Sequence, residues 1–97
     1  MENEERVRRI EEMEAQMDET LAAARALEQA LEDWETVQPK LKALAVYYAS
    51  PAWREDFAAD ERGELPPELK RGVLSEDGLW DLLEQARELE ERLREEE

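Results

Sequence analysis

Three carboxylates in the middle of the chain have a spacing that could suit a hard metal ion. Asp56, Asp60 and Glu64 follow one another at four-residue intervals, which places them on one face if the segment is helical. Carboxylate oxygens are the ligands that calcium and magnesium prefer. The chain has no histidine, however, and no Asp-rich loop of the calcium-binding type. A solvated acidic face is the better interpretation, and we expect no metal site.

Acid–base and nucleophilic catalysis lack their usual residues in this chain. Because there is no histidine and no cysteine, the commonest general base and the strongest nucleophile are both missing. Tyr47 or Tyr48 beside Lys42 offers an alternative acid–base group, but nothing in their spacing requires that role. We therefore expect a protein that is not an enzyme, with no cofactor and no small-molecule substrate.

The adjacent basic residues Lys70 and Arg71, together with several aromatic residues, are better candidates for a role in binding. We expect Arg71 to pair with a nearby carboxylate and so hold this part of the chain to the helices. The alternative is a contact between the basic pair and an acidic partner. The candidate carboxylates are Asp56, Asp60, Glu76 and Asp77. Aromatic residues and arginine dominate interface energetics, although such rings can also simply fill the core of a small domain. The candidate partner-binding residues are Tyr47, Trp53, Lys70, Arg71 and Trp80.

Two heptad patterns define the elements that would position these residues. Apolar residues recur at alternating steps of three and four over residues 10–34, with one polar position at Thr20. The same spacing returns over residues 79–93. Two such seams facing each other form an antiparallel pair. The sequence predicts a single domain, residues 1–97, with helices at about residues 3–37, 39–49, 51–61 and 76–94.

Prolines, a glycine and two serines are predicted to set the helix boundaries. Pro39 lacks an N–H, so a new or kinked helix is predicted to begin there. Ser50 and Ser75 are predicted N-caps, and Gly72 is predicted to be left-handed. The predicted fold class is all-α, a small antiparallel bundle. In it the long N-terminal helix pairs with the C-terminal helix, with two shorter aromatic-rich helices and a Pro/Gly corner between them.

Charge excludes several classes of partner. The chain has 28 acidic and 13 basic residues and a net charge of −15. Such a field repels phosphates and anionic lipids, so we expect binding to neither nucleic acid nor a membrane. No apolar run approaches the roughly 18 residues of a membrane-spanning helix, and the N-terminus lacks the apolar segment of a signal peptide. We expect a cytoplasmic protein.

Two long segments carry a family resemblance. LKALAVYYASPAWREDF and ELPPELKRGVLSEDGLWDLL resemble a family of small bacterial helical proteins, the domain of unknown function DUF4298. The run from Leu69 to Asp77 is the most specific part, and the resemblance covers nearly the whole length. It implies a compact intracellular helical protein and assigns no activity, ligand or catalytic residue.

These observations predict an interaction module that binds a protein partner through the aromatic, Leu69–Gly72 (LKRG) end of the bundle. Two alternatives stay open. The acidic helices could imitate nucleic acid and occupy a DNA- or RNA-binding protein. The first seam could instead associate with itself as a coiled coil, in a weak homodimer.

Overall fold

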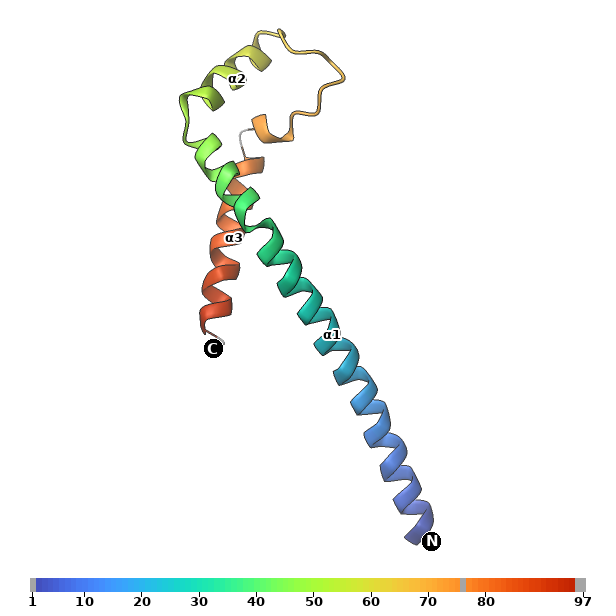
Figure 1. Cartoon of the computed structure of the whole chain (residues 1–97). Coiled ribbons are helices and arrows are strands. Elements are labelled where there is room, and N and C mark those ends of the chain that lie inside the picture. Colours follow the sequence, from blue (N-terminus) through green and yellow to red (C-terminus); the bar gives the residue numbers. More distant parts are fainter. Residues whose placement is uncertain (1, 76, 96–97) are drawn as a thin grey trace. The chain divides into compact units, whose positions relative to one another are not determined.

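The computed structural model describes residues 2–75 and 77–95, in which the regular secondary structure is all helical, with no strand. The elements are α1 (Glu2–Tyr48), α2 (Pro51–Glu61), the short 3₁₀ helix η1 (Gly72–Leu74) and α3 (Gly78–Glu95), in that order along the chain (Figure 1). The all-α class is therefore confirmed. Contacts within the chain divide it into two units, Met1–Gln38 and Pro39–Glu97.

The first unit is the part of α1 that precedes Pro39. Glutamate, alanine, leucine and arginine fill it, and all four are good helix formers. Its side-chain hydrogen bonds are local, such as the 3.1 Å bond from Gln29 Nε2 to Asp33 Oδ1 one turn away. The predicted seam is present as an exposed apolar stripe, in which Met17 is 55% and Leu27 58% exposed. Its pairing with the last helix stays a prediction.

Pro39 lies inside α1, so the predicted helix boundary at this residue is wrong. The segments predicted as separate helices, 3–37 and 39–49, form one helix that ends at Tyr48. The proline ring fixes φ near the helical value, so the residues after it can continue as helix. Pro39 costs the helix the hydrogen bond that its N–H would have made. Several good helix formers follow it, up to Ala45.

α2 begins at the predicted cap and ends where predicted. Ser50 has extended backbone angles, and its Oγ accepts a hydrogen bond from the Trp53 N–H at 3.4 Å. Pro51 occupies the first helical position, where its missing N–H costs nothing. The range predicted for this helix, 51–61, is confirmed.

The left-handed glycine is Gly63, so the prediction for Gly72 is wrong. Gly63 has φ of 71° and follows the end of α2. Its N–H bonds to the Asp60 carbonyl, and the N–H of Glu64 bonds to the Ala59 carbonyl, each at 3.0 Å. This is a Schellman motif, which satisfies the last carbonyls of a helix and requires a left-handed residue. Gly72 instead opens η1, where the backbone needs no positive φ.

Ser75 caps the start of α3 as predicted. Its Oγ accepts a hydrogen bond from the Gly78 N–H at 3.1 Å and donates one to the Gly72 carbonyl at 3.0 Å. The helix itself begins at Gly78, two residues later than predicted. Glu76, which we expected in its first turn, lies outside the described residues.

The second unit has a small core centred on η1. Among the described residues the buried apolar side chains are those of Leu74, Leu79 and Ala86, exposed by 6%, 3% and 3%. η1 contacts both α2 and α3, so it joins these two helices. Within residues 2–75 and 77–95, no helix combines the length and the apolar character that a membrane crossing requires.

Candidate functional site

Trp53 connects three parts of the second unit. Its ring lies edge-on to Tyr48 at the end of α1, with ring centres 5.0 Å apart. It also stacks on Phe57 one turn along α2, at 5.3 Å. The indole Nε1 donates a 2.8 Å hydrogen bond to the carbonyl of Val73 in η1. Trp53 therefore holds η1 against α2 and the end of α1.

Tyr47 forms a second link between α1 and α2. Its hydroxyl donates a 2.6 Å hydrogen bond to Asp56 Oδ2. This hydrogen bond, with partial burial and the negative charge of Asp56, raises the pKa of Tyr47 from 10.0 to about 12. The phenol is therefore protonated at neutral pH and acts as a hydrogen-bond donor within the fold.

Arg71 holds the Pro/Gly corner, the segment that connects α2 to α3, against α2, as predicted. Its Nη1 donates a hydrogen bond to Asp60 Oδ1, and its Nη2 lies 3.5 Å from the carbonyl oxygen of Pro67. The Arg71 and Asp60 side chains are only 33% and 27% exposed, so this ion pair is partly shielded from water.

The three evenly spaced carboxylates are used within the fold. Asp56 accepts from Tyr47, and Asp60 accepts from Arg71. Glu64 accepts two hydrogen bonds from the Arg62 guanidinium, at 2.8 and 3.1 Å. Each carboxylate thus has a partner in the chain.

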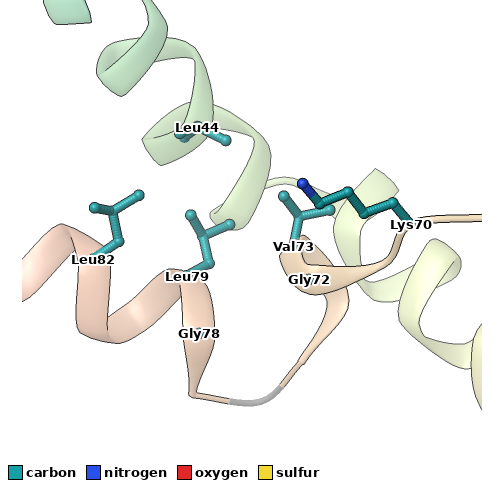
Figure 2. Close-up of a pocket in the computed structure, with 7 residues that line it drawn as sticks. All are labelled: Leu44, Lys70, Gly72, Val73, Gly78, Leu79 and Leu82. Carbon is teal, nitrogen blue, oxygen red and sulfur yellow. The ribbon is translucent and has the colours of Figure 1, made fainter.

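An open apolar hollow of about 490 Å³ lies beside η1 in the second unit (Figure 2). Leu79 and Leu82 of α3 point toward Leu44 of α1, and the Lys70 side chain extends past Val73 at the rim. Within the described residues Lys70 forms no ion pair. We call this the Lys70 hollow; it is lined by Leu44, Lys70, Gly72, Val73, Gly78, Leu79 and Leu82.

A second hollow, of about 520 Å³, follows the end of α1. Val46 at its edge is 66% exposed. The lining residues are Pro39, Lys42, Ala43, Val46, Tyr47 and Ser50. Each hollow thus has one lysine and no carboxylate among its described lining residues. Both hollows are lined in part by residues 39–49, a stretch that contains no acidic residue.

The structure separates the five predicted binding residues into two groups. Tyr47, Trp53 and Arg71 make the internal contacts of the corner. Lys70 lines the hollow, and Trp80 is 51% exposed on α3.

The apolar residues that line the Lys70 hollow were not predicted as a binding surface. Leu79 and Leu82 belong to the heptad pattern of residues 79–93, which was assigned to helix packing, and Leu44 lies in the predicted helix 39–49. The sequence signal for this region is the absence of acidic residues between positions 39 and 49.

The comparisons with known proteins identify a family. A model described as Domain of unknown function (DUF4298) matches residues 10–95, which include the seam, α2, the corner and α3. No curated protein and no solved structure matches this chain. Because the family match covers most of the sequence, the chain belongs to the DUF4298 family.

Proposed function

We propose that this chain is a non-enzymatic interaction module that binds a protein partner in the Lys70 hollow. The observation that carries the proposal is a lysine ammonium at the rim of an open apolar hollow, with no ion-pair partner among the described residues, in a chain with 28 acidic residues. The partner segment that fits this chemistry has a bulky apolar side chain next to a carboxylate.

The hollow and its lysine contribute differently to binding. Covering the apolar surfaces of Leu44, Val73 and Leu82 removes them from water and supplies the main favourable term in binding. The Lys70 charge orients the partner and raises the association rate more than it raises affinity. Trp80, which follows Leu79 in the sequence, is 51% exposed and offers a further aromatic surface on α3.

Tyr47, Trp53 and Arg71 have a supporting role in this proposal. They hold η1 to α2 and the end of α1, and η1 contributes Val73 to the hollow. The non-enzymatic part of the proposal is supported by the same contacts. Tyr47 stays protonated at neutral pH, and the carboxylates of Asp56 and Asp60 are engaged.

The test is affinity capture with matched variants. Lys70→Glu and Leu82→Glu change the hollow at exposed positions, and Leu82 is 41% exposed. Leu93→Glu makes the same substitution at a 39% exposed leucine of the same helix, outside the hollow. Lys40→Glu is the matched control for the lysine. All four should keep the helical content of the wild type.

We expect a protein that is captured by the wild type and both controls and lost with both hollow variants. Titration of that purified protein should show at least about tenfold weaker binding to Lys70→Glu and Leu82→Glu, about 1.4 kcal/mol each. Equal binding by all variants contradicts the proposal. If the captured protein binds DNA or RNA and is released equally from all variants by salt, nucleic-acid mimicry replaces it.

A further inference from the structure

The exposed seam of α1 is an apolar feature that the proposed function leaves unused. A contiguous stripe of this kind normally marks an interface. Thr20 and Ala24 lie at its middle, between larger side chains at both ends. The exposed members are Ile10 (53%), Met13 (50%), Met17 (55%), Leu27 (58%) and Leu31 (40%).

The last helix is too short to cover this stripe in any arrangement of the two units. α3 has 18 residues, so at 1.5 Å per residue it is about 27 Å long. The seam from Ile10 to Trp34 extends over about 36 Å on the same scale. The N-terminal part of α3 is also occupied in its own unit, because Leu79 is only 3% exposed. A longer apolar surface is needed, and α1 itself has the required length and spacing.

We propose that the α1 seam binds the same seam of a second copy of this chain, as a parallel two-stranded coiled coil. The unbroken alternation of three- and four-residue steps is the pattern of such a seam. The a positions are Ile10, Met17, Ala24 and Leu31, and the d positions are Met13, Thr20, Leu27 and Trp34. This inference does not depend on the Lys70 hollow.

Charge complementarity selects the parallel orientation. In a parallel pair the residue at g faces the e residue of the next heptad on the other helix. Here Arg9 at g faces Glu14 at e, and two-fold symmetry forms this opposite-charge pair twice. In an antiparallel pair with the seams aligned, e positions face each other. Glu14 then meets Glu28 of the second copy, and two like charges oppose association.

The polar position in the seam also favours the parallel arrangement. Thr20 lies opposite Thr20 of the second copy in a parallel pair, and the two hydroxyls can donate to and accept from each other. In the aligned antiparallel pair Thr20 faces Ala24, which offers no side-chain partner. A single polar layer fixes register at some cost in stability.

The net charge of the first unit makes this association weak and dependent on salt. Residues 1–38 contain twelve acidic and four basic residues, so two copies repel each other. Added salt screens this repulsion, and the dimer should therefore tighten as ionic strength rises.

Cysteine crosslinking tests the orientation directly, because the chain has no cysteine of its own. In a parallel coil, Met17→Cys places two thiols in the same a layer, within disulfide distance. Gln29→Cys, on the outer face, is the matched control. We expect the Met17→Cys dimer to form at least about tenfold faster than the Gln29→Cys dimer. Preferential crosslinking between Met17→Cys and Leu27→Cys chains would instead show an antiparallel pair and overturn the proposal.

Charge variants of the full chain, followed by sedimentation equilibrium, test the electrostatic part. Arg9→Glu and Glu14→Arg should each weaken the dimer by about fivefold, and combining them should restore it. Glu14→Arg reduces the net negative charge, so general repulsion alone would predict a tighter dimer. Tighter association of this variant, or a wild-type chain that stays monomeric in high salt, contradicts the proposal.

Discussion

The two units of this chain use their side chains in opposite ways. In the first unit the hydrogen bonds from Gln29 and Thr36 reach one turn along the helix, and the apolar seam is exposed. In the second unit the bonds of Tyr47, Arg71 and Trp53 connect residues 9, 11 and 20 positions apart. Helix propensity shapes the first unit, whereas specific contacts across a corner shape the second. Because most helical stability in proteins comes from packing of an apolar face rather than from propensity, the first unit has more to gain from a partner.

The largest expected effect comes from comparing one leucine in each unit. Leu74→Ala removes a side chain that is 6% exposed in η1, and it should lower the free energy of unfolding by about 3 kcal/mol. Leu27→Ala removes a side chain that is 58% exposed in α1, and below the concentration of dimer formation it should cost under about 0.5 kcal/mol. Urea unfolding measures the loss in free energy of unfolding for each variant. Equal losses would show that the seam is covered within the monomer.

A pair of glycines tests which backbone turn the second unit requires. Gly63→Ala places a side chain at φ of 71° and should cost about 1–2 kcal/mol, because the left-handed conformation strains residues with a Cβ. A Cβ at Gly72 would meet no atom within 4 Å, and its φ is not positive. Gly72→Ala should therefore leave the melting temperature unchanged or raise it slightly. The reverse ranking would contradict the placement of the Schellman motif.

Two ion pairs at either end of the corner differ in their exposure to solvent. Arg71→Ala removes the partly shielded pair with Asp60 and should cost about 1 kcal/mol. Arg62→Ala removes the pair between Arg62 and Glu64, whose side chains are 59% and 55% exposed, and should leave the melting temperature nearly unchanged. Thermal unfolding of both variants at low and high salt measures the contribution of each ion pair to stability. If the Arg71→Ala variant has the same melting temperature as the wild type, Arg71 does not hold the corner.

The smallest expected effect is a titration. In a Tyr48→Phe background the remaining tyrosine, Tyr47, should ionise with a pKa of about 12, as followed by tyrosinate absorbance. Asp56→Asn should return the pKa of Tyr47 toward 10.0, because the hydrogen bond that the phenol donates to this side chain becomes weaker and the negative charge is removed.

This titration also has a consequence for stability. Because the folded-state pKa of Tyr47 is raised, the stabilising contribution of its hydrogen bond is complete below about pH 10 and is lost as the pH rises through about 12. A normal pKa for Tyr47 would mean that the link between α1 and α2 is absent in solution.

Part of the candidate site could be predicted from the sequence, and the limit is visible at Arg71. The charge pattern predicted an ion pair and narrowed its partner to four carboxylates, and the fold selected Asp60. The sequence also pointed to Lys70. It could not show that Val73 and Leu44 would share one hollow, because nothing local relates residues so far apart in the chain.

The sequence alone determined the features that depend on atoms within one or two helical turns. These include the Ser50 and Ser75 caps, the extent of α2 and the spacing of the seam. Pro39 and Gly72 were mispredicted because a proline or a glycine permits more than one backbone outcome, and the surrounding chain decides among them. Only the tertiary structure decided which residues meet across the corner, such as the Trp53 indole and the Val73 carbonyl. The physical reason is that local signals act along one helix, whereas contacts between residues 11 or 20 positions apart exist only after the corner has folded.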